Sequence, residues 1–242
     1  MTGATEGPGL TGKVALVTGA SRGIGAAVAR RLAEAGVALG LASRSGDDLG
    51  IAGAVAPPTD VRDPAQLDAL VAATVQAHGG LDIVVANAGV GAYGPFLELD
   101  PEQLELMIDV NLKGVLYTAR AALPHLIEAP GGGDFISLAS VAGVNAFPGE
   151  AVYNASKFGQ VGFVRSLDIE LREHGVRCSS ICPGGVATDF AIGTGRTAGS
   201  PDLDGMMSGD DVAEVVMFAL TRPRSMRLMT TTFRPMSEGS WG

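Results

Sequence analysis

The sequence has 242 residues, of which 46% are hydrophobic and 18% are charged, a balance that suits one α/β domain. Its formal net charge of −9 argues against general binding to nucleic acid or to an anionic membrane surface. The first residues contain neither a basic region nor an apolar core, so we expect them not to act as a secretory signal peptide. No apolar run approaches the roughly 20 residues of a membrane span. We therefore expect no nucleic-acid and no membrane partner, and we predict a flexible tail at 1–12 before a single domain at 13–242.

The alternation of apolar runs and helical patterns predicts the fold. Because the connections are short, strands and helices in strict alternation indicate a doubly wound parallel sheet with helices on both faces, a Rossmann-type α/β fold. Strands are predicted at 13–18, 37–43, 55–61, 81–89, 134–140, 176–184 and 227–233. Helices are predicted at 26–36, 65–79, 102–129, 151–175 and 210–223.

One predicted crossover is unusually short. Only 15 residues lie between Arg44 and Asp60, and a parallel crossover needs about a dozen at minimum. Residues 47–54 therefore have room for a helix of one or two turns, which two glycines weaken. Pro57 and Pro58 limit the strand that follows to an edge or irregular strand.

The two cysteines, Cys178 and Cys182, lie four residues apart on one predicted strand. In an extended chain that spacing is about 13 Å, which is too long for a disulfide. No Cys and His cluster suggests zinc or another metal. We expect two free core thiols in a protein of the reducing cytoplasm.

A glycine-rich turn, TGASRGIG, joins the first predicted strand to the first helix. Gly19 permits a tight turn, and Gly23 and Gly25 let the backbone approach a pyrophosphate at the helix N-terminus. Such a turn alone is weak evidence, but its position after the first strand favours a dinucleotide site. Its spacing, GxxxGxG, differs from the GxGxxG of medium-chain and hydroxy-acid dehydrogenases.

The segment YNASK places Tyr153 and Lys157 four residues apart, on one face of a predicted helix. A tyrosine pKa near 10 is too high for efficient proton transfer at neutral pH, and a neighbouring ammonium lowers it. Ser140 ends a predicted strand, and strand carboxyl ends are where ligands bind in such sheets. The pattern thus suggests a proton-transfer site; an ordinary surface pair is the alternative.

Together with NAG at 87–89, these motifs resemble the classical short-chain dehydrogenase/reductase family over residues 13–188. The resemblance implies hydride transfer between a nicotinamide cofactor and a carbonyl or alcohol carbon. It implies that Tyr153 is the general acid/base and that Lys157 lowers its pKa and binds the nicotinamide ribose. It further implies that Ser140 polarises the carbonyl and that Asn111 holds a water in a proton relay.

The resemblance also implies a set of cofactor-binding residues. Asp60 and Val61 match a pair at the adenine, and Asn87 begins a turn near the adenosine ribose. Ser179 and Ala139 depart from the usual residues of the family, and we expect adjusted packing with activity retained. The implied cofactor-binding residues are Gly19, Ser21, Arg22, Gly23, Ile24, Gly25, Asp60, Val61, Asn87, Ala88, Gly89, Tyr153, Lys157, Pro183, Gly184, Val186 and Thr188.

The cofactor choice depends on the end of the second strand. Members that prefer NAD carry an acid there, whereas this chain has Ser43 followed by Arg44. A guanidinium suits a 2′-phosphate, and Arg22 resembles a second basic residue of NADP-dependent members. Asp47 and Asp48 are counter-evidence, since either could pair with Arg44. We predict NADP(H) rather than NAD(H).

The substrate is a small-molecule carbonyl or alcohol. Residues 189–208 match the substrate lid of the family, and their glycine-rich composition favours a shallow, mobile cover. A general ketone, aldehyde or small hydroxy-acid reductase is favoured, partly because the ending FRP resembles such members. The residues predicted to line the substrate pocket are Tyr93, Phe96, Val141, Asn145 and Phe147.

Other functions stay open. A 3-oxoacyl-ACP or -CoA reductase is the alternative, although the stretch LIEAPGGGD lacks the basic residues expected for an acidic carrier protein. A sensor that binds NADP(H) without turnover is a further alternative, and an extended-type epimerase is disfavoured. Wide apolar faces on the helices at 102–129 and 151–175 suggest a homo-oligomer, a dimer or tetramer as in relatives.

Overall fold

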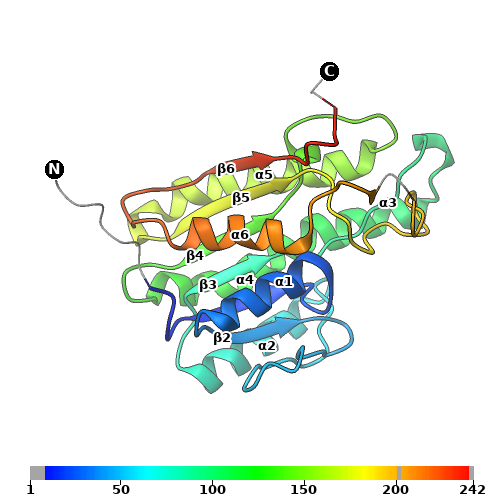
Figure 1. Cartoon of the computed structure of the whole chain (residues 1–242). Coiled ribbons are helices and arrows are strands. Elements are labelled where there is room, and N and C mark those ends of the chain that lie inside the picture. Colours follow the sequence, from blue (N-terminus) through cyan, green and yellow to red (C-terminus); the bar gives the residue numbers. More distant parts are fainter. Residues whose placement is uncertain (1–8, 201–202, 240–242) are drawn as a thin grey trace.

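Six parallel strands form one sheet in the computed structural model, which describes residues 9–200 and 203–239 (Figure 1). The strand order is β2-β1-β3-β4-β5-β6, with parallel pairing throughout. The predicted α/β fold with a doubly wound parallel sheet is confirmed. The strands are β1 (Val14–Thr18), β2 (Ala38–Ala42), β3 (Ile83–Ala86), β4 (Asp134–Leu138), β5 (Arg177–Pro183) and β6 (Thr230–Phe233).

Helices cover both faces of this sheet. On one face, α1 (Gly23–Glu34) and α6 (Gly209–Leu220) pack beside each other (Figure 1). On the other face lie α2 (Pro64–His78), α4 (Gly114–Glu128) and α5 (Ala151–Leu171). Every residue of β1 and β3 is buried, as expected for apolar strands that are covered on both sides. No helix within 9–200 and 203–239 is long and apolar enough to cross a membrane.

The predicted long helix at 102–129 is interrupted. Its first part is α3 (Pro101–Met107), a π-helical segment follows at Ile108–Lys113, and α4 continues the same path. Asp100 and Pro101 start it as their residue types suggest, and the Asp100 backbone N–H donates to Gln103 Oε1 at 3.2 Å. Such π-bulges occur most often at functional sites, and this one contains Asn111. Shorter 3₁₀ turns occur at Phe96–Glu98, Val141–Gly143 and Arg172–His174.

The short crossover after β2 contains neither the predicted helix nor the predicted third strand. The carboxylates of Asp47 and Asp48 each accept a backbone N–H two residues ahead, at 2.8 and 2.9 Å. Leu49 and Gly50 adopt positive φ of 57° and 68°, which a right-handed helix excludes. Residues 55–61 form only two isolated bridges to β2, Val55 with Gly40 and Pro58 with Ser43. The expected helix was wrong, because local aspartate turns compete with a weak helix. The expected strand is reduced to irregular pairing, the limit that Pro57 and Pro58 set.

The termini and the lid segment differ in part from expectation. Of the predicted flexible tail, residues 1–8 lie outside the described residues, and residues 9–12 pack on the domain. Leu10 is buried, and the Gly12 N–H donates to the carbonyl of Gly36 at 3.0 Å. The predicted lid at 189–208 consists of turns where it is described, and residues 201–202 lie outside that part.

At the amino ends of the strands, away from the cavity, a buried arginine connects β4, β5 and α6. Arg177 begins β5, and its Nε donates to Oδ1 of Asp134, its register partner on β4, at 2.7 Å. The same guanidinium donates to the carbonyls of Leu220 and Arg222, at the end of α6, at 3.3 and 3.0 Å. Its side chain is only 6% exposed.

We predict that Arg177→Met lowers the free energy of unfolding by about 3–5 kcal/mol, because it breaks a buried ion pair and leaves several carbonyls without donors. Urea unfolding measures this change. As a control, Arg30→Met on the exposed side of α1 should stay within about 0.5 kcal/mol of wild type. A loss below about 1 kcal/mol for Arg177→Met would contradict the structural role of the pair.

Candidate active site

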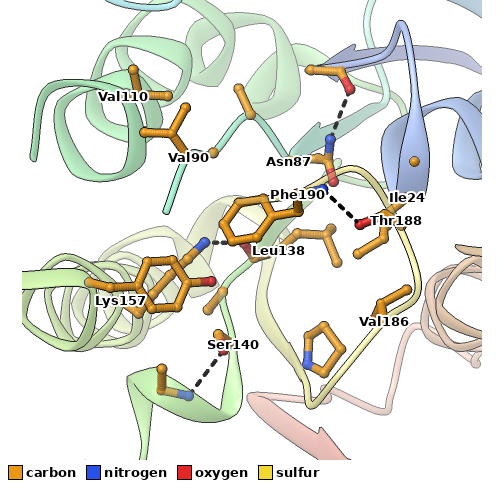
Figure 2. Close-up of a pocket in the computed structure, with 18 of the residues that line it drawn as sticks. Ile24, Asn87, Val90, Val110, Leu138, Ser140, Lys157, Val186, Thr188 and Phe190 are labelled. Atoms are coloured by element: carbon orange, nitrogen blue, oxygen red, sulfur yellow. Dashed lines mark hydrogen bonds between the residues drawn. The ribbon is translucent and has the colours of Figure 1, made fainter. Parts of the chain in front are cut away.

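A cavity of about 580 Å³ follows the carboxyl ends of the parallel strands, where ligands bind in sheets of this kind. Figure 2 shows Ile24 and Thr188 on one side of it and Ser140 and Lys157 on the other. The predicted site residues that line it are Gly19, Ser21, Arg22, Gly23, Ile24, Ser43, Arg44, Asp60, Val61, Asn87, Ala88, Gly89, Tyr93, Ser140, Val141, Phe147, Tyr153, Lys157, Pro183, Gly184, Val186 and Thr188.

The glycine-rich turn lets three segments meet closely. Gly19 has a φ of +64°, and a Cβ on it would lie 2.8 Å from the Cα of Ala88. Gly25 does not line the cavity, but a Cβ there would clash with the carbonyl oxygen of Gly19. Helix α1 begins at Gly23, so its first backbone N–H groups lack intrahelical partners and are available to a ligand. The bare backbone and free donors fit a pyrophosphate group.

Asn87 joins the ends of β1 and β3 beneath this turn. Its Nδ2 donates to the carbonyls of Thr18 and Gly19 at 2.9 and 3.1 Å. In return, Thr18 Oγ1 accepts from the backbone N–H groups of Asn87 and Ala88 at 3.0 and 3.1 Å. These four bonds hold the two strand ends in one arrangement, so they set the position of the glycine turn.

The end of β2 presents Arg44 to the cavity. Neither Asp47 nor Asp48 forms an ion pair with it; both carboxylates are engaged in the turns described above. Ser43 is buried, and its Oγ accepts from the Asp47 N–H at 3.2 Å. The counter-evidence from the two acids is thereby removed, because they do not neutralise the Arg44 guanidinium.

The carboxylate of Asp60, which was predicted to lie at the adenine, is engaged by a neighbouring arginine. Both oxygens of its carboxylate accept from Arg62, whose Nη2 lies 2.6 Å from Oδ2. Hydrogen bonding to Arg62 holds the pKa of Asp60 below its usual value. Its backbone N–H donates to Gln66 Oε1 at 2.8 Å. Val61 beside it is buried and packs near Val110, which supplies an apolar wall to this part of the cavity.

Tyr153 and Lys157 lie on the cavity side of α5, one turn apart, as predicted. The Lys157 Nζ is 5.6 Å from the centroid of the Tyr153 ring, and both side chains are buried. Burial raises the pKa of Tyr153, a change that the Ser140 hydroxyl opposes. Burial lowers the pKa of Lys157 to about 8. Lys157 is not among the groups that change the pKa of Tyr153 here, so its lowering of that pKa remains an expectation from the family resemblance.

Asn111 lies behind these residues and does not line the cavity. Its side-chain Nδ2 donates to the carbonyl of Val90 at 2.9 Å and to Ser156 Oγ at 3.0 Å. Its backbone carbonyl accepts from Nε2 of Gln160, a fully buried side chain on α5. The other end of that amide, Oε1, accepts from Lys157 Nζ at 3.3 Å. Gln160 therefore bridges Lys157 and Asn111, a link that the sequence analysis did not anticipate.

The two cysteines are buried in the strand β5, and Cys182 lies close enough to Ser140 and Lys157 to be influenced by both. Cys178 and Cys182 are free and buried, as predicted. Burial raises the pKa of Cys178 to about 12 and that of Cys182 to about 11, so neither forms a thiolate at neutral pH. Among residues 9–200 and 203–239, no group of three or more His, Cys, Asp or Glu side chains is placed to hold a metal ion.

Comparison with known proteins agrees with this arrangement. Residues 13–198 match the short chain dehydrogenase family. The chain belongs to this family. It is 38% identical, over 234 residues, to an uncharacterized oxidoreductase of Staphylococcus aureus, covering 94% of this chain and 99% of that one.

Solved structures of short-chain dehydrogenases resemble it closely. An alcohol dehydrogenase from the archaeon Thermococcus sibiricus, complexed with 5-hydroxy-NADP, matches at a TM-score of 0.85 and 32% identity, over 95% of this chain and 99% of that one. A serine dehydrogenase complexed with NADP+ matches at a TM-score of 0.87 and 29% identity, over 95% and 97%. Other similar structures are complexes with NADP and with NAD.

At the substrate end of this short-chain dehydrogenase, the predictions hold in part. Tyr93, Val141 and Phe147 line the cavity, whereas Asn145 and Phe96 do not. The Asn145 carbonyl accepts from Asn154 Nδ2 at 2.8 Å, which fixes the turn after Ser140 from below. Phe96 is 55% exposed on a 3₁₀ turn. Both expectations were wrong, because proximity to a motif in sequence does not fix the direction of a loop residue.

Several residues of the cavity were not predicted. Two aromatic rings lie beside that of Tyr153. The centroid of the Phe190 ring is 5.8 Å from the centroid of the Tyr153 ring, and that of the Tyr93 ring is 5.6 Å from it. The available signal was the lid segment 189–208, in which Arg196 is the one basic residue. Among the residues that were not predicted are Glu150, Phe190, Arg196, Arg234 and Glu238 at the cavity and Gln160 behind it.

We predict that Gln160→Leu lowers the free energy of unfolding by about 1–3 kcal/mol at pH 7, because the Lys157 ammonium loses an acceptor and the Asn111 carbonyl loses a donor. The cost of burying the charged lysine is present in full below pH 8. It is relieved as pH rises from about 8, where the folded protein loses this proton, toward 10.5, where the unfolded chain does. The deficit should therefore shrink at pH 9.5.

Urea unfolding at the two pH values measures this change. The control is Gln76→Leu, at an exposed position of α2, which should change stability by no more than about 0.5 kcal/mol at either pH. A deficit for Gln160→Leu that is equal at pH 7 and pH 9.5 would show that the bond to Lys157 contributes nothing.

Proposed function

We propose that the protein is an NADP(H)-dependent oxidoreductase that interconverts a carbonyl group and a secondary alcohol. The observation that carries this proposal is that one cavity holds Tyr153, Lys157 and Ser140 at one end and the glycine turn at the other. Membership of the short-chain dehydrogenase family supports it. A cavity with only a nucleotide cradle would support binding, whereas this one adds groups suited to proton transfer.

The residues present fit a nicotinamide dinucleotide. The glycine turn would hold its pyrophosphate, Val61 and Asn87 its adenosine half, and Val186 and Thr188 its nicotinamide. When bound, the nicotinamide supplies or accepts a hydride at the reacting carbon. Everything else in the reaction is the work of the chain: binding, orientation and proton transfer.

In our proposal Tyr153 handles the proton. In reduction its hydroxyl donates a proton to the oxygen of the former carbonyl, and in oxidation its phenolate takes that proton back. Ser140 donates a hydrogen bond to the same oxygen. Lys157, held by the carbonyl of Leu138 at 3.0 Å and by Gln160, brings a positive charge near the phenol and binds the nicotinamide ribose. Burial of Tyr153 and Lys157 strengthens these interactions.

The preference for NADP(H) that we propose rests on charge at the end of β2. Arg44 faces the cavity unopposed by Asp47 and Asp48, and Ser43 replaces an acid that would repel a phosphate. Arg22 lies across the cavity, with its Nη1 4.0 Å from Asp189 in an exposed, weak pair. Two guanidinium groups at one end of a cavity suit a 2′-phosphate.

We also propose a homo-oligomer in the reducing cytoplasm. Phe158 and Ile169 on α5 are 46% and 73% exposed, more than expected for large apolar side chains of a monomer's helix. Covering them with a second copy would bury this surface. The free, buried cysteines support a compartment in which thiols stay reduced.

We predict that Tyr153→Phe lowers kcat by about 10²–10⁴-fold, because it removes only the hydroxyl that transfers the proton. Binding of NADPH, followed by its fluorescence, should stay within about threefold. NADPH oxidation with a panel of ketones, β-keto esters and aldehydes provides the assay. Tyr117→Phe, on α4 away from the cavity, is the control and should retain activity. Wild-type protein that binds NADPH but reduces no panel member would instead support the sensor.

We predict that Arg44→Asp lowers the ratio of kcat/KM for NADPH over NADH by about tenfold or more, because a carboxylate repels the 2′-phosphate. Steady-state kinetics with both cofactors and one ketone measures the ratio. Arg30→Asp makes the same change of charge on the exposed side of α1, and it should leave the ratio unchanged. An unchanged ratio for Arg44→Asp would refute the assignment.

A further inference from the structure

Two oppositely charged side chains face the substrate end of the cavity, and neither has an ion-pair partner among the residues that the structure describes. They are Arg196, from the lid segment, and Glu150, which precedes α5. Charged groups are costly to desolvate, and a pocket for neutral ketones gains nothing from them. Their presence beside Tyr153 therefore calls for a ligand that carries charge.

Arg196 is held in place but not neutralised. Its guanidinium carbon lies 6.0 Å from the centroid of the Tyr93 ring and 5.9 Å from that of Phe190. One of its nitrogens, Nη1, donates to the carbonyl of Val186 at 3.2 Å. Within 9–200 and 203–239 no carboxylate lies within 4.0 Å of it, so most of its five N–H donors remain for a ligand.

Glu150 is the matching acid. Its carboxylate makes no hydrogen bond to the first turn of α5 and no ion pair with any described residue. Burial raises the pKa of Glu150, and the Arg196 charge opposes this rise, so the two groups influence each other without touching. A donor from a ligand would stabilise this half-buried carboxylate.

Arg234 and Glu238, also at this end of the cavity, differ from Arg196 and Glu150 because they contact each other directly. Glu238 Oε2 accepts from Arg234 Nε at 2.6 Å, and Oε1 accepts from the Gly185 N–H at 2.7 Å. That carboxylate is already engaged within the protein. Arg196 and Glu150 are thus the charged pair at this end that the fold leaves for a ligand.

The distances limit the size of that ligand. The guanidinium of Arg196 and the ring of Tyr153 share the same two aromatic neighbours, Tyr93 and Phe190. Each of the four distances to these rings is 6.0 Å or less, so a molecule between the guanidinium and the Tyr153 ring is flanked by both aromatic rings. A group that reacts at Tyr153 and an anionic group at Arg196 can therefore belong to one small molecule.

We propose that the substrate is a small hydroxy acid whose carboxylate is bound by Arg196 and whose 2-amino group, when present, is bound by Glu150. A guanidinium binds a carboxylate through two parallel hydrogen bonds, which also orients the hydroxyl carbon toward Tyr153. The oxo acid is the substrate in the opposite direction. This inference rests on the proposed oxidoreductase function and adds its substrate class.

Four related alcohols test it: 3-hydroxybutyrate, its methyl ester, threonine and allo-threonine. The last two add a 2-amino group to the skeleton of 3-hydroxybutyrate. Oxidation is followed as NADP+ reduction. We expect wild type to favour the acid over the ester by about tenfold or more in kcat/KM. Arg196→Met should bring the acid-to-ester ratio of kcat/KM close to one through a higher KM for the acid, and Arg196→Lys should restore part of the ratio. Glu150→Gln should lower kcat/KM for threonine relative to kcat/KM for 3-hydroxybutyrate.

A matched control and a binding measurement separate the outcomes. Arg222, whose guanidinium carbon lies 4.1 Å from the Phe218 ring outside the cavity, provides the control Arg222→Met, which should change no ratio. Equal losses for acid and ester in Arg196→Met would overturn the inference, since they would make Arg196 a brace for the lid through Val186. Calorimetric binding of 3-hydroxybutyrate to the NADP+ complex, weakened about tenfold by Arg196→Met, would support it even if no alcohol were oxidised; that result would refute only the proposed function. Absence of binding, with ester oxidised, would refute only the inference.

Discussion

The buried ammonium group of Lys157 sets the conditions that the surrounding elements meet. A charge in that position needs acceptors from the protein itself, and β4 supplies the Leu138 carbonyl while α5 supplies Gln160. Gln160 in turn engages the Asn111 carbonyl, which is accessible because the helix around it is π-helical and its hydrogen-bond ladder is interrupted. The break in the long helix, the end of β4 and the position of Tyr153 are therefore parts of one network.

Much of this was predictable because the signals were local. Buried apolar strands, the glycine turn, and Tyr153 with Lys157 one turn apart depend on residues near one another in sequence, and all lie where they were expected. The prediction of a helix in the crossover after β2 also failed for a local reason. The side chains of Asp47 and Asp48 accept backbone hydrogen bonds that compete with those of a helix, and the spacing of apolar residues does not reveal this competition.

The residues that were missed depend on long-range placement. Arg196 meets Tyr93 across 103 positions of sequence, and the lid turns that bring it there have no periodic pattern. Gln160 was invisible for another reason, since a polar residue in a long helix normally suggests a solvated face. Asn145 and Phe96 were placed wrongly because a loop after a strand end has no alternation that tells inside from outside. The sequence can thus locate a site without showing which substrate the site binds.

The irregular segment beside β2 also affects how readily one molecule associates with another. An exposed strand edge is a template on which another chain can pair and aggregate. Here Val55 exchanges backbone hydrogen bonds with Leu39 and Leu41, and Pro58, which has no N–H to offer, lies against Ser43. The loop that leaves Arg44 open to the cavity thus also closes the margin of the sheet, so an irregular crossover protects against edge-to-edge association.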